Sequence, residues 1–440
     1  MALHLLDLSN FQKLLTAQNR NRAEKLALAV TDQLLFSGSN FIVSILLARW
    51  MSYDTYGTFS FTYSVFMLLA SVHNSLLLEP YTVIGSSEHR FHLKTYAHRN
   101  AQLNLLWTVA VSGLSLAVAA AAFLAGHPML GESLIGLSLA QGAILYFWYV
   151  RRKWYVNQKI GRSLIGTTVY LIAQLAFVWG LQRAALLTPL TAFLAVAAAA
   201  LLASAAARLS SEEADVAPEP VNLRSIIREN WTYGKWVLLA SVLFWLTGQG
   251  YNVLTGSLLT LSDTAGLKAL QNLVNPIIQV LAAFNLVFLP WISRHHADNG
   301  LEASNKYFLL YALFVTLAAL AYWIFLVVFS APIFDLLYRG QYKEYIYLLP
   351  VLAVIPIVSA LSASWALGLR VLRQTRLLFW VDSVGAAFTI TFGVLLVSQY
   401  GLGGAVIGSA VSSVSRLPVL ALLWRRATHE NVPQSPKVHA

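Results

Sequence analysis

The sequence predicts an all-α polytopic membrane protein, with about twelve transmembrane helices in two six-helix lobes around a central cavity. Hydrophobic residues make up 58% of the 440 residues and charged residues only 11%, whereas soluble domains carry about 25% charge. The mean hydropathy is +0.62. Apolar segments of about 20 residues, the length that crosses a bilayer core, recur along the chain. Lipid is therefore the solvent for most of this chain.

Composition also excludes several classes of protein. Cysteine is absent, so disulfides, iron–sulfur clusters and thiolate zinc sites cannot form. The motifs typical of ATP hydrolysis, zinc peptidases, serine hydrolases and dinucleotide binding are missing. We therefore expect no enzyme, no catalytic residue, no cofactor and no metal site. The net charge of +11 is explained by membrane topology, without nucleic acid as a partner.

The expected spans follow one another with short connections. Their approximate ranges are 27–49, 57–79, 102–125, 129–150, 163–181, 186–207, 234–260, 267–290, 307–330, 346–367, 377–398 and 402–424.

The spans group into two lobes. Residues 1–26 form a cytoplasmic N-terminal segment that could lie on the membrane surface as a helix. The N-terminal lobe covers 27–208, and the C-terminal lobe covers 234–424. Between them, 209–233 is a polar stretch that begins acidic and ends basic, which is typical of a cytoplasmic linker. Residues 425–440 form a cytoplasmic tail.

The distribution of positive charge predicts the orientation. With the N-terminus inside, 24 of the 30 Lys and Arg residues fall in inner segments and 5 in outer loops, as the positive-inside rule requires. Both termini are then cytoplasmic. The basic run from Arg151 to Arg162 is interpreted first as a cytoplasmic anchor, and binding of anionic lipid headgroups is the alternative.

The two lobes resemble each other in sequence. Gly38 and Pro80 are 42 residues apart, and so are Gly248 and Pro290. With six spans in each half, these repeats are parallel, related by an axis along the membrane normal.

Polar residues recur at helical spacing within four spans, the first two of each half. The residues are Gln33, Ser37, Asn40 and Ser44; Ser64, Ser71, Ser75 and Glu79; Ser241, Gly248, Gln249, Asn252 and Thr255; and Gln271, Asn275 and Gln279. Such stripes commonly join helices by tight packing and hydrogen bonds. Four stripes in corresponding spans of two halves instead indicate a polar cavity along the pseudo-axis.

Charged residues within the spans are candidates for function, because a central charge costs about 2.5–3.5 kcal/mol on insertion scales. The candidate cavity residues are Asp32, Gln33, Asn40, Arg49, Glu79, Gln249, Asn252, Asn275, Asp382 and Arg416. Structural alternatives stay open. Asp32 could be hydrated near the inner interface. Arg49 and Glu79, both placed at outer span ends, could pair with each other, and Arg416 could pair with Asp382. His73 could titrate, or could simply be a hydrogen-bonded residue.

The beginning of the chain resembles a known family. The residues that carry the resemblance are Thr31-Asp32-Gln33, Ser37-Gly38-Ser39-Asn40-Phe41, Leu47-Ala48-Arg49 and Tyr56-Gly57-Thr58-Phe59. They are similar to the start of Wzx-type polysaccharide transporters, the O-antigen and exopolysaccharide flippases of the multidrug/oligosaccharidyl-lipid/polysaccharide exporter superfamily. The family's arginine in the first span corresponds to Arg49 and its acidic position to Asp32. The superfamily's peptidoglycan-precursor flippases have fourteen spans, two more than this chain.

The resemblance implies a function. Such a protein moves a polyprenyl-diphosphate-linked oligosaccharide across the bacterial inner membrane by alternating access, through a cationic or polar cavity. Its partners would be the lipid-linked glycan, membrane lipid, a glycan polymerase and glycosyltransferases. Coupling to H⁺ or Na⁺ is left open. One alternative is a cation-coupled drug exporter that uses Asp32, Asp382 or His73, and another is a membrane-embedded glycan polymerase or ligase.

Overall fold

The computed structural model describes residues 17–86, 89, 92–209, 222–372, 374 and 376–430, and all regular structure among them is helical. Its elements are α2 (Ala17–Trp50), α3 (Tyr53–His73), η2 (Asn74–Leu78), α4 (Glu79–Ser86), α5 (Leu93–Leu124), α6 (Pro128–Val156), α7 (Ile160–Arg183), α8 (Pro189–Leu209), α9 (Leu223–Gly248), α10 (Gly250–Leu258), α11 (Leu261–Val328), α12 (Ser330–Tyr338), η3 (Lys343–Leu348), α13 (Leu349–Leu352), α14 (Val354–Val371), α15 (Arg376–Phe388), η4 (Thr389–Gly393), α16 (Val394–Val414) and α17 (Arg416–Glu430).

Several helices are longer than the spans predicted from hydropathy. α2 begins at Ala17, inside the expected N-terminal segment, and α17 ends at Glu430, inside the expected tail. α9 begins at Leu223, so the second half of the expected linker is helical. Polar and charged turns continue a helix without changing its backbone geometry, which is why hydropathy alone misses them. The rest of these three segments, 1–16, 210–221 and 431–440, lies outside the described residues.

Nine helices of the described chain are long and apolar enough to cross a membrane, or ten if the bent pair α9 and α10 counts as one span. The first arm of α11 is not among them, and the stretch from Arg376 to Thr428 counts once although it reverses direction. Including both arms of each reversal gives the twelve passes that the sequence predicts. The fold class is confirmed.

Two glycines make these reversals possible. Gly300 in α11 has φ 79° and Gly401 in α16 has φ 58°, a left-handed conformation that side chains with a Cβ rarely adopt. On either side of Gly300 the arms run antiparallel, since Phe288 stacks on Tyr311 with ring centroids 4.4 Å apart. Across Gly401, the Thr389 hydroxyl donates to the Ser412 hydroxyl over 3.2 Å.

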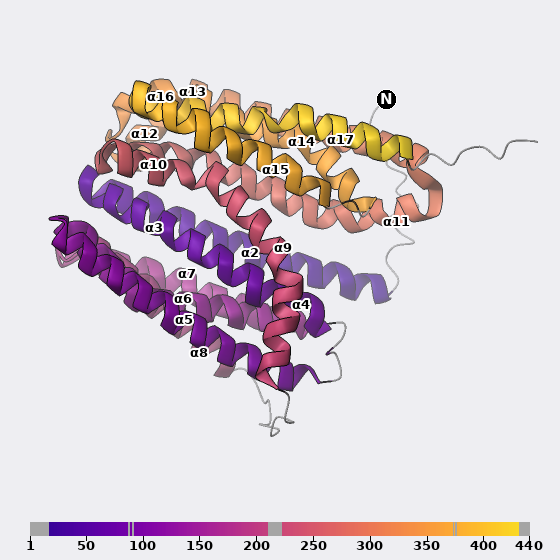
Figure 1. Ribbon diagram of the computed structural model, residues 1–440, viewed down its shortest axis with the longest axis horizontal. Coiled ribbons are helices and arrows are strands. Elements are labelled where there is room, and N and C mark those ends of the chain that lie inside the picture. The colour runs from indigo at the N-terminus through magenta and orange to yellow at the C-terminus, as the bar shows by residue number, and fades with distance from the viewer. Residues whose placement is uncertain are drawn as a thin grey trace, which may run out of the picture.

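The helices form two bundles that meet along a central interface. Helices α2–α8 form the N-bundle at the bottom of Figure 1, and α9–α17 form the C-bundle at the top, except that the first half of α9 runs down beside the N-bundle. Most of the contacts between them are made by α2, α3 and η2 of the N-bundle with α9, α10 and α11, and α12 adds contacts with α2. We call the end with the α2–α3 turn the sealed end, at the left of Figure 1. The end where α2 begins and α17 finishes is the terminal end.

The sealed end depends on two helix starts that cross. Ser52 caps α3 by accepting from the Thr55 backbone N–H, and Thr260 caps α11 in a capping box with Asp263, which satisfies otherwise unpaired backbone groups. The helices cross where Gly57 meets Leu261. A Cβ on Gly57 would lie 1.7 Å from the Leu261 carbonyl oxygen, so only glycine permits this approach.

Aromatic residues complete the seal between the bundles. The rings of Tyr53 and Tyr342 lie 4.6 Å apart, and the Tyr53 hydroxyl accepts from the Tyr342 backbone N–H over 3.0 Å. The Tyr342 hydroxyl donates to the Ala48 carbonyl over 3.3 Å. Tyr56, Tyr338 and Tyr342 are fully buried. The bundles therefore exclude solvent from one another at this end.

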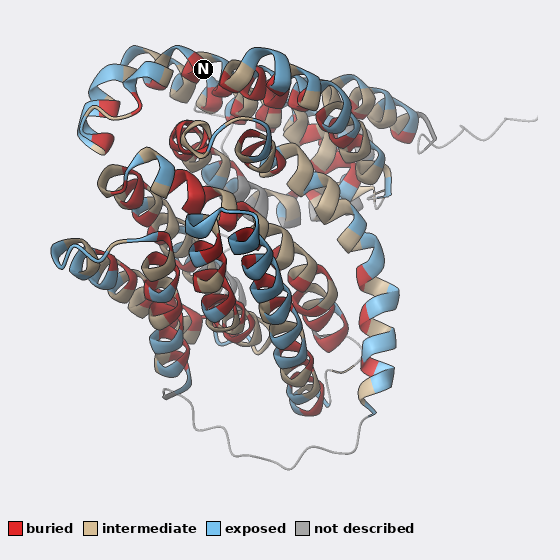
Figure 2. Cartoon of the chain, turned by 60° about the vertical axis from the view of Figure 1, so that its left-hand side comes forward, coloured by how far each residue is buried: buried red, intermediate tan, exposed pale blue. Residues whose placement is uncertain are grey.

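The outer faces of both bundles are apolar. Exposed residues cover the outward sides of the helices, and buried residues lie where helices face each other (Figure 2). Leu124 is 91% exposed, and Leu105, Ile172 and Leu309 are also exposed. Surfaces of this kind are stable against acyl chains, and polar side chains are consequently directed inward.

We expect Gly57→Ala to open the sealed end. The added methyl overlaps the Leu261 backbone, and overpacking of this kind costs about 1–3 kcal/mol. Because the chain has no cysteine, a Met51→Cys background offers one thiol at a buried position of the sealed end. The maleimide labelling rate of that thiol should rise by about tenfold.

The matched control is Gly113→Ala, because a Cβ on Gly113 meets nothing within 4 Å. Equal labelling rates in the two variants would show that the crossing at Gly57 does not hold the sealed end closed.

Candidate functional site

The polar stripes of α2 and α11 face each other. The Ser44 hydroxyl donates to Asn272 Oδ1 over 3.0 Å, and the Ser37 hydroxyl donates to Gln279 Oε1 over 3.3 Å. Gln33 extends the chain of contacts by donating from Nε2 to the Ser37 hydroxyl over 3.2 Å. We call this contact line the α2–α11 seam. Beyond Gln279, no hydrogen bond or ring contact joins the two helices among the side chains that the structure describes.

The stripe of α3 faces α9 and α10 in the same way. The Ser64 hydroxyl donates to Gln249 Oε1 over 3.1 Å, and the Ser75 hydroxyl donates to that of Ser241 over 2.9 Å. Asn252 is fully buried and donates from Nδ2 to the side-chain oxygen of Gln249 over 3.0 Å. We call this contact line the α3–α9 seam.

The two seams have the same register under the predicted repeat. In the predicted repeat, Gly38 of the first half is equivalent to Gly248 of the second half. By the same spacing, Ser44 of α2 is equivalent to residue 254, and Asn272 of α11 is equivalent to residue 62. Two contacts between the bundles flank the pair of residues 62 and 254. On one side, a Cβ on Gly256 would meet the Phe61 ring at 2.4 Å, and on the other, Ser64 bonds Gln249. The two seams therefore correspond approximately under the predicted repeat, which stays a prediction.

A buried cation lies between the seams. Lys268 of α11 is 5% exposed, and its Nζ lies 5.2 Å from the centre of the Tyr63 ring of α3. The structure gives it no ion pair or hydrogen bond within the described residues. The sequence analysis did not single out this lysine, which stands at the start of the span predicted over 267–290. Its spacing of three residues from Gln271 is the signal that could have placed it on the polar stripe.

A cavity of about 390 Å³ opens between the bundles near the α3–α9 seam. It is lined by Met67, Ala70, Ser71, Asn74 and Trp148 of the N-bundle and by Val237, Ala240, Ser241, Phe244 and Asp382 of the C-bundle. Asn74 begins the π-helical turn η2, a local widening that is frequent at functional sites. Both bundles therefore contribute polar groups to one space.

Two arginines approach this cavity. Arg152 donates from Nη2 to Asn74 Oδ1 over 3.3 Å, and the described residues give it no ion pair. Arg416 donates from Nη1 to Asp382 Oδ1 over 3.0 Å, so the pairing that the sequence offered as an alternative is confirmed. Arg151 and Arg152, the first residues of the run interpreted as a cytoplasmic anchor, both bond side chains within the protein.

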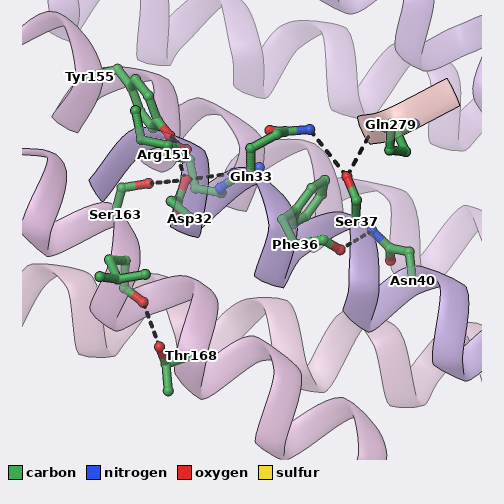
Figure 3. A network of polar contacts seen from close by, with 12 residues as sticks. Asp32, Gln33, Phe36, Ser37, Asn40, Arg151, Tyr155, Ser163, Thr168 and Gln279 are labelled. Atoms are coloured by element: carbon green, nitrogen blue, oxygen red, sulfur yellow. Dashed lines mark hydrogen bonds and ion pairs between the residues drawn. The ribbon is translucent and has the colours of Figure 1, made fainter. Parts of the chain in front are cut away.

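Asp32 is an anchor within the N-bundle. Its Oδ2 accepts from Arg151 Nη2 over 2.7 Å, from the Tyr155 hydroxyl over 2.8 Å and from the Ser163 hydroxyl over 3.2 Å, so α2, α6 and α7 converge on one carboxylate oxygen (Figure 3). Arg151 also covers the Phe36 ring at 3.9 Å. Asp32 is fully buried, which corrects the expectation that it could be hydrated near the interface.

The alternative in which Arg49 pairs with Glu79 is wrong, and so is the placement of Glu79 at an outer span end beside Arg49. Arg49 lies at the sealed end, where its Nη1 donates to the Leu336 carbonyl over 3.3 Å. Glu79 lies toward the terminal end, and its Oε1 accepts from the Tyr233 hydroxyl over 3.2 Å. The span that begins at Tyr53 runs in the opposite direction to α2, and its 26 residues before Glu79 separate the two groups by about 39 Å.

Three other candidates have local roles or no partner. Asn40 donates to the Phe36 carbonyl over 3.0 Å and accepts from the Tyr170 hydroxyl over 3.3 Å. His73 is fully buried and bonds Asn104 over 2.6 Å, as the structural alternative predicted. Asn275 is partly exposed, and the structure records no hydrogen bond for it among the described residues. The described chain contains no group of three His, Asp or Glu residues that could hold a metal.

Comparisons with known proteins agree with this geometry. Residues 149–347 match the family described as "Polysaccharide biosynthesis protein". No curated protein sequence matches the chain.

Solved structures share the fold. An inward-facing multidrug resistance MATE family transporter of the MOP superfamily has TM-score 0.72 at 14% identity, over 90% of this chain and 95% of that one. A eukaryotic MATE transporter has TM-score 0.67 at 15% identity, over 93% and 98%. A MOP superfamily transporter from Pyrococcus furiosus has TM-score 0.66 at 12% identity, over 92% and 95%.

The chain is a multi-pass membrane protein, and its fold is similar to that of the MATE and MOP superfamily transporters named above. The family match over residues 149–347 agrees with the resemblance to polysaccharide transporters that the sequence carries.

We expect Asp32→Asn to lower the stability of the protein. Arg151 would remain buried without its carboxylate, and breaking a buried ion pair costs about 3–5 kcal/mol. Thermal unfolding of the purified protein in lipid or detergent measures the loss. The control is Asp335→Asn, because the Lys343–Asp335 pair is about half exposed and such pairs contribute about 0–1 kcal/mol. Equal stability of the two variants would contradict the anchoring role of Asp32.

Proposed function

We propose that this chain is a flippase that moves a polyprenyl-diphosphate-linked oligosaccharide from the inner to the outer leaflet of the bacterial inner membrane, for surface polysaccharide synthesis. The family match to polysaccharide biosynthesis proteins supports the class of substrate. In this proposal the two bundles rock about the space between the seams. They expose it first at the terminal end and then at the sealed end.

The observation that carries the proposal is Lys268. An ammonium buried without an opposite charge costs several kcal/mol, yet Lys268 is 5% exposed, and the contact that the structure records for its ammonium among the described residues is with the Tyr63 ring. A diphosphate that enters this space would supply the missing counter-charge through charge-assisted hydrogen bonds. Arg152, next to the cavity and without an ion pair in the described chain, is suited to meet the same group earlier on its path.

The sugars need hydrogen bonds in place of water, since unpaired polar groups are costly in an apolar medium. Side chains along the seams offer them, and several retain free capacity. Asn252 Oδ1 is buried without a partner, and Asn275 is partly exposed between the bundles. Ser and amide groups of this kind bind hydroxyls without demanding one particular sugar.

The lipid tail requires an apolar route beside the polar one. The α2–α11 seam ends at Ser37 and Gln279, and toward the terminal end Leu34, Val280 and Phe284 are exposed on the two helices. The α3–α9 seam, in contrast, continues to Glu79 and Tyr233. We assign the tail to the α2–α11 side, where it stays in the bilayer while the headgroup crosses.

The orientation follows from charge. The terminal end carries most of the Lys and Arg residues outside the membrane, so in this proposal it faces the cytoplasm and both termini are cytoplasmic. The open space between the bundles then faces the compartment in which lipid-linked glycans are assembled.

The alternative functions have less support. A cation-coupled drug exporter needs available carboxylates, but Asp32 and Asp382 are each bonded to an arginine. A glycan polymerase or ligase needs reactive groups in a sizeable outer domain. In the described chain the longest connection at the sealed end is the stretch from Phe329 to Tyr342, most of which is the short helix α12.

We expect Lys268→Gln to slow translocation by about tenfold or more, since a hydrogen bond to a charged group contributes about 1.5–3 kcal/mol. The measurement is movement of a polyprenyl-diphosphate-linked oligosaccharide across reconstituted vesicles. Lys306→Gln is the matched control, because Lys306 is exposed near the terminal end, and it should keep its rate.

A variant that carries both Lys268→Gln and Arg152→Gln should be slower still. If this double variant elutes as a folded protein and translocates the glycan at the original rate, the cationic pathway is wrong. If the original protein moves no lipid-linked glycan but exports cationic drugs, the drug-exporter alternative replaces the proposal.

A further inference from the structure

The first half of α9 presents one face to its surroundings. Its exposed residues recur at spacings of three and four, which places them on one side of a helix. The stripe consists of Arg224, Ile227, Arg228, Trp231, Lys235 and Leu239, and the exposed Ser225 and Thr232 lie along one edge of it. Trp236, beside this stripe, is 66% exposed, and the Lys235 ammonium lies 6.0 Å from the centre of its ring.

The opposite face of the same segment is fixed to the N-bundle. Asn230 is 3% exposed, accepts from the Tyr96 hydroxyl over 2.8 Å and donates to Asn100 Oδ1 over 3.0 Å. Gly234 packs against η2, where a Cβ would lie 2.5 Å from the Ser75 carbonyl oxygen. The stripe therefore lies on the side of α9 that faces away from the N-bundle.

The stripe is positively charged. Its cations are Arg224, Arg228 and Lys235, and the structure records no ion pair for them within the described residues. Glu229 is the one acidic residue of α9, and its Oε2 bonds His89 Nε2 over 2.8 Å. The exposed face thus carries three positive charges and no carboxylate of its own helix.

We propose that this face of α9 binds an anionic phospholipid of the leaflet at the terminal end, such as phosphatidylglycerol. The order of residues along the helix fits a lipid better than a soluble anion. Arg224 and Arg228 come first, Trp231 and Trp236 follow, and the exposed Leu239 and Phe244 continue the helix. This order matches the passage from headgroup to interface to acyl chains, since tryptophan is enriched at interfaces and cations attract anionic headgroups.

The bound lipid acts on a helix that joins the bundles. α9 is tied to the N-bundle through Asn230, and after a bend of 52° it continues as α10 within the C-bundle. A lipid bound to the outer face stabilises the packing of the first half of α9 against the N-bundle, and therefore the relative position of the two bundles in this structure. The three cations and the two tryptophans of this site lie outside the proposed substrate path, and Phe244 is the residue of the described chain that the site shares with the cavity lining.

The experiment titrates the full-length protein in detergent with phosphatidylglycerol and counts bound lipids by native mass spectrometry. We expect R224Q/R228Q/K235Q to weaken the tightest binding by about tenfold or more, because each cation contributes roughly fivefold. The control is K306Q/R425Q/R426Q, which removes three exposed cations from the C-bundle near the same end and should keep the tightest binding unchanged.

Further arms identify the ligand. Phosphatidylcholine should bind equally weakly to all three proteins, and water-soluble glycerol phosphate should not compete. Equal losses in the two triple variants would overturn the proposal, because lipid binding would then follow overall charge. Displacement by glycerol phosphate would also overturn it, in favour of a soluble anion. Both results are independent of whether the protein translocates a glycan.

Discussion

Lipid offers no hydrogen bonds, and this constraint determines which helices lie at the centre of the molecule. A polar side chain at bilayer depth has to find its partner inside the protein. α2, α3, α10 and the first arm of α11 carry such side chains, and they pair across the two seams. Helices with apolar outer faces, such as α5, surround them. The central space between the bundles therefore follows from the position of a limited set of serines, asparagines and glutamines.

The charged residues divide by sign in a way that favours anions. The acids Asp32 and Asp382 are each neutralised by an arginine of their own bundle. Lys268 has no such partner in the described chain, and Arg152 bonds Asn74 of the cavity lining and lies within electrostatic reach of Glu79 without forming a recorded ion pair with it. A cavity with bound acids and available cations attracts a negatively charged headgroup and repels a positive one. The polarity of the space is thus set by which charges are already paired.

Sequence patterns predicted the helices, their number and one charge pair, because these depend on hydropathy and spacing. The pairing of Arg416 with Asp382 could be anticipated, since two opposite charges within neighbouring spans rarely remain apart. The direction in which Asp32 points could not, since it depends on how α2 is rotated about its axis against α6 and α7.

Other errors came from geometry that composition does not encode. Glu79 was placed at the wrong end because the reversal of direction after α2 was overlooked. Asn74 was missed because the π-helical turn that directs it toward the cavity has no hydropathy signature. Lys268 was missed because a charge at the edge of an apolar segment resembles a loop residue. Each of these positions depends on tertiary packing, not on local periodicity.

The unequal length of the two seams has a mechanical consequence. One edge of the interface is bonded from the crossing near Phe61 to the contact of Glu79 with Tyr233, whereas the other loses its bonds after Ser37 and Gln279. Two halves joined along one edge separate by rotating about that edge, which acts as a hinge. Rotation of one bundle about this hinge widens the α2–α11 side of the interface first. A long-chain molecule would therefore enter the interface from that side, one molecule at a time.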